Sequence, residues 1–400
     1  MSSRPALAAV PGRPRNVLLW HWGRVGAGSK FTYELARELR NVPGIEPTVS
    51  ASEGSQLAML ADSDKNIVLR TVRTFEGNKA SWTGKVSAAT GLLGLWQLAR
   101  DFRGILTERQ TDVAICTFQS IWDLAAIPIL RWHANRFILI LHDAKFHPGD
   151  YYPFRESVLR WEVATADALI VLSDNVGRAA QQLYDFPPDR IWIVPHGALS
   201  FGAGTVTPRA FPHNRPTRLL FFGRIVTYKG LGHLLDVYRL LRERGAAVEL
   251  DIVGSGDLAP YKSQLAGLPA VSINNAWVDE EQIAQALARA DIMMLPYIEA
   301  SQSGVAAAAL TAGLPIVATP VGGLVEQVRC GQTGIIAKGI GPEDLAAAIQ
   351  SLIDDPSLYE TCSAGALEHA RSELSWARIA TKIAAIAKEV ALRPRRRGQR

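Results

Sequence analysis

Short hydrophobic runs alternate with helix-like segments along most of the chain. Residues 16–22, NVLLWHW, form the first run, and Phe31, Leu35 and Leu39 then recur at the spacing of one helix face. The later runs are rich in Ile, Val and Leu with little polar alternation, which is typical of strands buried on both faces of a parallel sheet. We predict strands at residues 16–22, 66–72, 112–117, 137–142, 168–172 and 191–195, and helices at residues 29–40, 92–106, 121–132, 152–166 and 175–184.

The alternation pauses at residues 198–215, where Gly, Pro and Thr occur without a clear period, and then resumes. Such a pause is typical of a linker. The two blocks of alternation predict an α/β fold of two Rossmann-like domains, whose parallel sheets face each other across a cleft. In the second block we predict strands at residues 218–222, 248–253, 271–274, 292–296, 315–318 and 334–337, and helices at residues 231–244, 280–290, 305–312, 342–354 and 357–372.

These patterns also predict the organisation of the whole chain. The final helix could pack back on the first domain, although its sequence alone does not require it. The predicted parts are a flexible leader at residues 1–15, an N-terminal Rossmann-like domain at 16–200, a linker at 201–216, a C-terminal Rossmann-like domain at 217–374, a helix at 375–392 and a basic tail at 393–400.

The composition is that of a globular protein of about two domains, because hydrophobic residues make up 48% and charged residues 20% of 400 positions. Three widely spaced cysteines, Cys116, Cys330 and Cys362, imply no disulfide framework and fit a reducing compartment. No apolar run is long enough to cross a bilayer. We therefore expect a cytoplasmic protein.

The net charge of +5 comes from the C-terminal end of the chain. The last eight residues contain five arginines and no acid, and the rest of the chain has 38 basic and 38 acidic residues. The folded body therefore gives no sign of the positive face that a nucleic-acid site needs. We interpret the tail as a solvated end, or as a contact for the anionic inner face of a membrane. Residues 86–106 could likewise lie on a bilayer, or form a buried crossover helix.

Ligands of open α/β sheets bind beyond the carboxyl ends of the strands, so the loops after the predicted strands carry the candidate chemistry. The first such loop, GRVGAGSK, is not a P-loop, because Ser29-Lys30 reverses the required order. It is not a dinucleotide fingerprint either, because Phe31 stands where a third small residue is needed. Gly26 and Gly28 therefore indicate a tight turn or a close backbone approach to a ligand.

His142 ends the strand predicted at residues 137–142 and is followed by Asp143. Its spacing to His147 does not match a helical metal pair, and no cysteine or third histidine supports a metal site. Its position at the end of an apolar strand, facing the cleft, favours a functional role over a structural one.

Gly223, Arg224 and Lys229 follow the first strand of the second domain. Glycine lets the backbone come close to a ligand, arginine can bind phosphate oxygens in pairs, and lysine supplies a point charge. Two cations near one point favour a diphosphate ligand over two solvated surface charges.

Two later loops of the second domain also follow strands. In one, Glu299 could accept hydrogen bonds from sugar hydroxyls or form a salt bridge. In the same loop, Ser303, Gly304 and Val305 would point backbone N–H groups from a helix start toward an anion. In the next, a glycine pair precedes Glu326, whose place at a helix start is explained by the helix dipole.

Taken in order along residues 16–372, these motifs resemble those of the family 4 glycosyltransferases, which have the two-domain GT-B fold. Each match alone is unspecific, but the set is specific for the fold. The matching motifs are the glycine loop at residues 23–28, His142-Asp143, Pro195-His196-Gly197, Gly223-Arg224 with Lys229-Gly230, Val253-Gly254-Ser255-Gly256, residues 312–319, and Gly322-Gly323 with Glu326.

The resemblance implies a retaining glycosyltransferase that moves a hexose from a UDP- or GDP-sugar to a glycan or lipid-linked acceptor, in the synthesis of a cell-surface polysaccharide or glycoconjugate. The N-terminal domain would hold the acceptor and the C-terminal domain the donor. The implied roles are the diphosphate and the departing nucleotide for Arg224 and Lys229, the donor sugar for His142 and Glu299, the phosphates for Ser303, Gly304 and Val305, and close approach of the donor for Gly26, Gly28 and Gly223.

One position departs from the family pattern. The family often has two glutamates separated by seven residues in the segment of Glu299, and the second binds the nucleotide ribose. Here Ala307 is the eighth residue after Glu299 and Ala308 adjoins it, and neither side chain can accept a hydrogen bond. The contact with the ribose, and the identity of the nucleotide, are therefore open.

The resemblance also implies that no metal or other cofactor takes part, with Arg224 and Lys229 in place of a metal. Asp62-Ser63-Asp64 is the only match to the Asp-x-Asp step of metal-dependent transferases, and we interpret it as a turn between predicted elements. The nucleotide sugar would be a co-substrate.

Two other functions are open from the sequence. A nucleotide-sugar epimerase of the same fold would need a water-activating acid in the cleft, and no carboxylate is marked out for that role. A non-catalytic module that binds a nucleotide sugar is supported by the missing second glutamate. The presence of His142, Arg224 and Lys229 favours a transferase instead.

Overall fold

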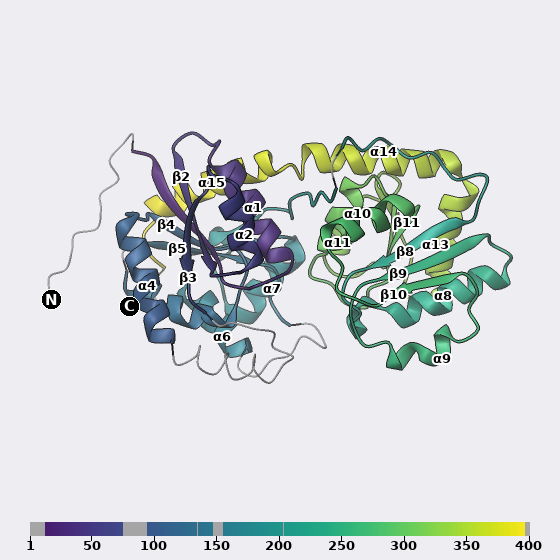
Figure 1. Cartoon of the computed structure of the whole chain (residues 1–400), viewed down its shortest axis with the longest axis horizontal. Coiled ribbons are helices and arrows are strands. Elements are labelled where there is room, and N and C mark those ends of the chain that lie inside the picture. The colour runs from purple at the N-terminus through teal and green to yellow at the C-terminus, as the bar shows by residue number, and fades with distance from the viewer. Residues whose placement is uncertain (1–12, 75–93, 134, 147–154, 203, 397–400) are drawn as a thin grey trace.

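The computed structural model describes residues 13–74, 94–133, 135–146, 155–202 and 204–396. It consists of two lobes, each built on a parallel β-sheet flanked by helices (Figure 1). The helix α14 (Pro356–Ser372) runs along the C-terminal lobe, and α15 (Trp376–Leu392) continues from it to the N-terminal lobe. The predicted fold class, two Rossmann-like domains with parallel sheets, is confirmed.

The sheet of the N-terminal lobe has seven parallel strands in the order β3-β2-β1-β4-β5-β6-β7. Both of its faces are buried, because Leu19 and its neighbour Leu18 belong to hydrophobic clusters on opposite sides. The chain order reverses between β1 and β4, where parallel sheets bind their ligands. The strands are β1 (Arg15–His21), β2 (Ile45–Ser52), β3 (Val68–Val72), β4 (Val113–Cys116), β5 (Arg136–Leu141), β6 (Ala168–Val171) and β7 (Ile191–Ile193).

The helices of this lobe bury one stripe each, as amphipathic crossover helices do. In the first, Phe31, Leu35 and Leu39 are all buried, as their spacing predicts. The helices are α1 (Ala27–Leu39), α2 (Gln56–Ser63), α4 (Leu95–Glu108), α5 (Ala126–Trp132), α6 (Arg155–Thr165) and α7 (Asp174–Tyr184), with short 3-10 turns at Ile121–Ala125 and Pro188–Arg190.

The sheet of the C-terminal lobe has six parallel strands in the order β10-β9-β8-β11-β12-β13, and its order reverses between β8 and β11. The strands are β8 (Thr217–Phe222), β9 (Val248–Val253), β10 (Val271–Asn274), β11 (Ile292–Leu295), β12 (Ile316–Ala318) and β13 (Gly334–Ile336). The remaining helices are α8 (Leu231–Glu243), α9 (Lys262–Leu265), α10 (Glu280–Arg289), α11 (Gly304–Thr311), α12 (Leu324–Gln327) and α13 (Pro342–Asp354).

The strand β2 has no counterpart among the predicted elements, and neither do the short helices α2, α9 and α12. β2 reads IEPTVSAS, so hydroxyl side chains occupy buried positions where a hydrophobic residue would have marked a strand. Ser50 and Ser52 are satisfied by hydrogen bonds to Trp22, because Ser50 Oγ accepts from its indole N–H at 3.1 Å and Ser52 Oγ donates to its carbonyl at 2.8 Å.

The last helix, α15, belongs to the core of the N-terminal lobe. Ile379 and Ile383 are buried in the same hydrophobic cluster as α1. The indole N–H of Trp376 donates to the carbonyl of Ala198 at 2.7 Å, and its ring fills the space that a side chain at Gly197 would need. The chain therefore crosses between the lobes twice and is fixed to the N-terminal lobe at its end.

The arginines that follow α15 pack against the N-terminal lobe. Arg395 donates to carbonyls at the end of α5, those of Leu130, Arg131 and His133 among them. Arg396 lies 4.6 Å from the ring centre of Phe186. Burial lowers the pKa of both Arg395 and Arg396. The interpretation of a solvated tail is therefore wrong for residues 393–396, whose cations bind the protein itself. Residues 397–400 lie outside the described residues.

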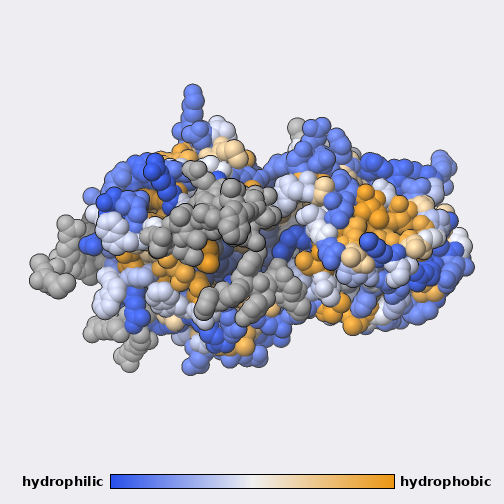
Figure 2. Space-filling model, turned by 60° about the horizontal axis from the view of Figure 1, so that its bottom comes forward, coloured by the Kyte–Doolittle hydropathy of each residue, from blue (hydrophilic) through white to orange (hydrophobic). Residues whose placement is uncertain are grey.

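The helix α4 covers part of the stretch that could have lain on a membrane. Leu98, Phe102 and Leu106 are buried in the core, as a buried crossover helix requires, whereas Trp96 is 72% exposed. Residues 75–93 lie outside the described part of the chain. Among the described helices, none is long and apolar enough to cross a membrane. The face in Figure 2 is mainly hydrophilic, with hydrophobic areas on both lobes, the more extended one on the C-terminal lobe.

Arg395→Ala should lower the free energy of unfolding by about 1–3 kcal/mol, because several hydrogen bonds from a charged group to carbonyls are lost together. Urea denaturation measures this change. Lys382→Ala, exposed on α15, is the control. Equal stabilities of the two variants would contradict a structural role for the tail.

Candidate active site

Loops at the carboxyl ends of strands of the two sheets contact each other across the lobe boundary. Two ion pairs join the lobes here, one between loops and one between helices. Lys145, after β5, lies with its Nζ 2.6 Å from Oε1 of Glu299, after β11. Lys30 of α1 lies with its Nζ 2.8 Å from Oε2 of Glu280 of α10. The loops of the N-terminal lobe and those of the C-terminal lobe that carry the predicted site residues therefore belong to one region of the molecule.

His142 is buried at the end of β5. Its Nε2 lies 2.8 Å from the carbonyl oxygen of Thr117, which can only accept, so Nε2 carries the proton and Nδ1 is an acceptor. Within the described residues this Nδ1 has no hydrogen-bond partner. Burial, and then the charge of His196, lower the pKa of His142 to about 4, so the imidazole is neutral at pH 7.

His21 is a second buried histidine, and the sequence reasoning missed it. Its Nδ1 donates to the carbonyl of Phe118 at 3.0 Å, and its Nε2 has no partner in the described part of the chain. Burial lowers its pKa to about 4. The two histidines thus flank the end of β4 from the neighbouring strands β1 and β5, each as a neutral group. The sequence signal that could have identified His21 is its position at the end of a predicted strand, just before a glycine loop.

The glycine loop is shaped by the rings beside it. A Cβ atom at Gly28 would lie 2.8 Å from Cγ of Phe118 and 2.9 Å from Nε2 of His21, so only glycine fits. Gly26 has φ +112°, a conformation that favours glycine, and open space where a Cβ would be. The protein's own rings therefore explain Gly28, and a ligand contact at Gly26 and Gly28 stays a prediction.

The predicted cations gather at the end of β8. Lys229 is buried, with its Nζ 5.4 Å from the ring centre of Tyr297. A Cβ atom at Gly223 would lie 2.8 Å from that Nζ, so the glycine makes room for the ammonium. Arg224 is exposed beside them. Burial raises the pKa of Tyr297 to about 12, although the nearby charge of Arg224 acts to lower this pKa. The structure thus brings Gly223, Arg224 and Lys229 together.

The start of α11 adjoins these cations through Tyr297, whose hydroxyl lies 3.2 Å from Oγ of Ser303. The N–H of Ser303 is already used, since it donates to Oε1 of Gln327 at 2.7 Å. The N–H groups of Gly304 and Val305 make no hydrogen bond to the described residues. Of the three predicted phosphate contacts, these two amides are available at the positive end of the helix. Sequence reasoning missed Gln327, which holds Ser303.

Glu299, the predicted sugar-orienting carboxylate, is paired with Lys145 of the other lobe. Both side chains are partly exposed, at 31% and 64%. Because Lys145 is exposed, solvent screens the pair and it contributes on the order of 1 kcal/mol or less, although the paired oxygen of Glu299 is itself buried. Sequence reasoning missed Lys145. Ala307 and Ala308 are buried in α11 and place no polar side chain there.

Glu326 stands in α12, but its carboxylate serves a different helix. It accepts from the backbone N–H of Asp174 at 2.6 Å and of Asn175 at 2.9 Å, at the start of α7 in the N-terminal lobe. Glu326 does stand in the first turn of α12, as predicted, but the dipole of that helix does not account for these two hydrogen bonds. The positive helix end that it stabilises lies across the lobe boundary.

Two other features lie away from this site. Asp62 and Ser63 form the last turn of α2, and Asp64 pairs with Arg40 at 3.2 Å, so the step predicted as a turn is the end of a helix. Within the described residues, no group of three or more His, Cys, Asp or Glu is placed to hold a metal ion.

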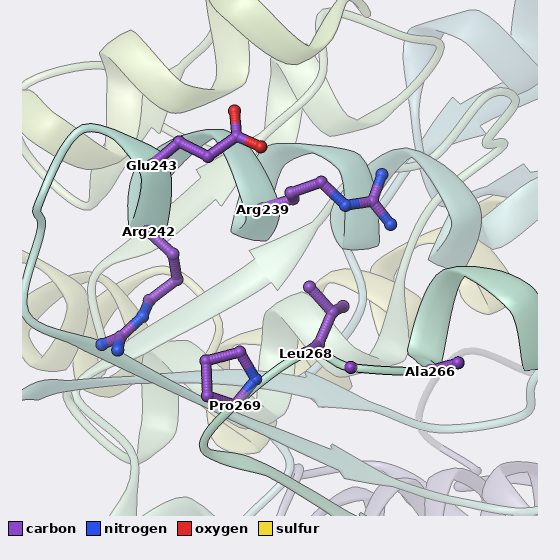
Figure 3. Close-up of a pocket in the computed structure, with 7 residues that line it drawn as sticks. Arg239, Arg242, Glu243, Ala266, Leu268 and Pro269 are labelled. Carbon is purple, nitrogen blue, oxygen red and sulfur yellow. The ribbon is translucent and has the colours of Figure 1, made fainter.

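A pocket of about 390 Å³ lies between the end of α8 and the segment before β10, at the opposite edge of the second sheet from the candidate site (Figure 3).

Both lobes match known protein families. Residues 28–198 match the family described as Glycosyltransferase Family 4, and residues 216–355 match Glycosyl transferases group 1. The two matches are consecutive and cover most of the two lobes.

Several individual proteins are also similar to the chain. A D-inositol 3-phosphate glycosyltransferase of Thermomonospora curvata is 30% identical over 241 residues, 53% of this chain and 54% of that protein. A glycogen synthase of Mycobacterium tuberculosis is 28% identical over 233 residues, 58% and 56% of the two chains. The chain thus spans about half the length of these curated relatives. The Anabaena protein HepE, solved with UDP-glucose, is similar in fold, with a TM-score of 0.68, 17% identity and coverage of 94% of this chain and 99% of that one.

The two neutral histidines predict a loss of stability in acid. Burial lowers the pKa of His142 from 6.5 to about 4, so between these values the unfolded chain binds more protons than the folded one. The contribution of each neutral histidine to the free energy of unfolding is therefore fully present above pH 6.5. It falls as the pH drops toward 4, by up to about 1.4 kcal/mol for each pH unit and histidine.

Urea unfolding at pH 7 and pH 5 measures this loss. His142→Asn should lose less stability than the wild type on acidification, and the exposed His213→Asn should lose as much. An equal loss in all three proteins would mean that His142 is not held neutral by burial.

Proposed function

We propose a function from the premise that this chain belongs to the group 1 glycosyltransferases of family 4: it transfers a sugar from a nucleoside-diphosphate sugar to a hydroxyl group of an acceptor. One observation carries the proposal. The available amides of Gly304 and Val305 lie at the start of α11, next to a loop that holds Arg224 and Lys229. A helix start and two cations at one point suit a diphosphate better than any other common ligand group.

In the proposed reaction these groups act on the leaving nucleotide. The bond between the sugar carbon and the diphosphate oxygen breaks, and negative charge grows on that oxygen. Lys229 is buried, so its charge acts through less water than an exposed lysine would, and fixed charges of this kind stabilise a transition state without rearranging. Arg224 can bind two phosphate oxygens at once. We propose that these cations neutralise the charge without a metal.

The proposed place of the donor sugar is between His142 and Glu299. Nδ1 of His142 is buried, has no hydrogen-bond partner among the described residues and can only accept, and a sugar hydroxyl that reached it would be the donor it needs. Glu299 would accept from other hydroxyls as its bond to Lys145 loosens. We propose a hexose, transferred with retention, from UDP or GDP.

The acceptor is proposed to bind on the N-terminal lobe, as the family resemblance implies. A glycan or a lipid-linked sugar carries the required hydroxyl, and assembly of a cell-surface polysaccharide or glycoconjugate is the corresponding process. Attachment to a membrane surface would have to use parts other than Arg395 and Arg396, because these cations are bound to the protein's own N-terminal lobe.

An epimerase activity is less well supported than transfer. It needs an acid that activates water in the cleft, whereas Glu299 is paired with Lys145 and Glu326 with the start of α7. A non-catalytic module would bind the same donor, and only turnover separates it from a transferase.

Thermal unfolding with a panel of UDP-, GDP- and ADP-sugars tests the donor site. A ligand at about 100 times its Kd stabilises the native state by about 2.7 kcal/mol. We expect a shift with one nucleotide, unchanged by EDTA and lost in Arg224→Ala. The exposed Arg378→Ala should keep it. A shift that EDTA abolishes would contradict the metal-independent site, and no shift with any nucleotide would contradict the donor proposal.

Lys229→Ala should lower turnover by about two orders of magnitude or more, because a fixed charge near the leaving group is lost. Its circular dichroism spectrum should match that of the wild type. The assay measures nucleotide release from the donor selected by the thermal panel, with the exposed Lys262→Ala as control. Unchanged turnover would remove Lys229 from catalysis.

A further inference from the structure

We propose that α12 couples the closure of the two lobes to the phosphate-binding start of α11. In this arrangement Glu326 makes one of the contacts that hold the lobes together, and Gln327 is a positioning residue for Ser303. The coupling to phosphate rests on the proposed function, whereas the closure contact does not.

Glu326 contacts the start of α7 with both oxygens of its carboxylate. Each carboxylate oxygen accepts one N–H, from Asp174 and Asn175, which are the first two residues of α7. The first N–H groups of a helix have no partner within the helix and carry its positive end. A carboxylate is therefore a well-matched partner, and here it comes from the other lobe.

A second contact between the lobes lies next to the first. The hydroxyl of Ser173 donates to the carbonyl of Ser301 at 2.9 Å, and the same oxygen accepts the N–H of Val176, capping α7. Ser301 belongs to the loop that carries Glu299. The start of α7 thus touches both α12 and the donor-side loop.

The glycines before α12 fix it to that loop. The N–H of Gly323 donates to the carbonyl of Ala300 at 3.2 Å. At Gly322 and Gly323 a Cβ atom would collide with the carbonyls of Ala300 and Ser301. Backbone lies directly on backbone here, so the start of α12 is held closely against the loop.

Gln327, the residue after Glu326, contacts the start of α11. The side chain of Gln327 binds Ser303 on both sides, because Oε1 accepts its N–H at 2.7 Å and Nε2 donates to its carbonyl at 3.1 Å. Ser303 is the N-cap of α11, with Oγ accepting from Ala306. Gln327 therefore sets the direction in which the amides of Gly304 and Val305 point.

Two consecutive side chains of α12 thus reach two different places. Glu326 binds the N-terminal lobe, and Gln327 binds the start of the phosphate-facing helix. When the lobes separate, Glu326 loses both amides and α12 loses one of its anchors. Closure and nucleotide binding should then favour each other, since coupling between two events is reciprocal.

The test compares Glu326→Ala, Glu326→Gln and Gln327→Ala with two exposed controls, Glu360→Ala and Gln285→Ala. Small-angle X-ray scattering gives the radius of gyration, with and without UDP or whichever nucleoside diphosphate stabilises the wild type. Calorimetry gives the affinity for that nucleotide.

We expect Glu326→Ala to have a larger radius of gyration than Glu360→Ala, and an affinity lower by about threefold, because a carboxylate at a helix start is lost. Glu326→Gln, which keeps an acceptor but no charge, should lie between. Gln327→Ala should keep the wild-type radius and lose about tenfold in affinity, since two hydrogen bonds to Ser303 are lost.

An unchanged radius in Glu326→Ala would overturn the closure contact, and an unchanged affinity in Gln327→Ala would overturn the positioning role. These outcomes differ from a failure of the proposed function, in which the wild type itself binds no nucleotide. In that case the scattering comparison of the free proteins still decides whether Glu326 holds the lobes together.

Discussion

A parallel sheet can place the loops that follow its strands at one edge only, and the site depends on holding two such edges face to face. The chain does this with α15, which returns from the C-terminal lobe and buries Ile379 and Ile383 in the N-terminal core. Contacts of Glu326 and Ser173 then join the two edges themselves. Without such contacts, nothing would hold the carboxyl ends of the two sheets next to each other.

The two edges differ in their electrostatics, and the difference fits a donor with an anionic part and a neutral part. On the N-terminal side, burial keeps His21 and His142 neutral and leaves each with an acceptor nitrogen. On the C-terminal side, Lys229, Arg224 and the start of α11 concentrate positive charge. A sugar offers hydroxyl donors, and a diphosphate offers negative oxygens, so each side suits one end of a nucleotide sugar.

Much of the fold follows from the sequence because its strands are continuous apolar runs. The missed strand β2 shows the limit of this signal, since its buried Ser50 and Ser52 are satisfied by Trp22, a partner that only the folded chain brings near. Within the site, the grouping of Gly223, Arg224 and Lys229 follows from their nearness in sequence. The partners of Glu299 and Glu326 lie more than 150 residues away, as Lys145 and the start of α7, and no local pattern can reveal them. The basic tail was misjudged for the same reason, because the carbonyls that bind Arg395 come from α5.

We propose that the start of α11, with Arg224 and Lys229, binds the diphosphate of the donor. The most direct measurement is a crystal structure of the protein with the nucleoside diphosphate that stabilises it most. The account predicts phosphate oxygens within hydrogen-bonding distance of the N–H groups of Gly304 and Val305 and of the side chains of Arg224 and Lys229. A nucleotide bound elsewhere, or with its phosphates turned away from these groups, would contradict it.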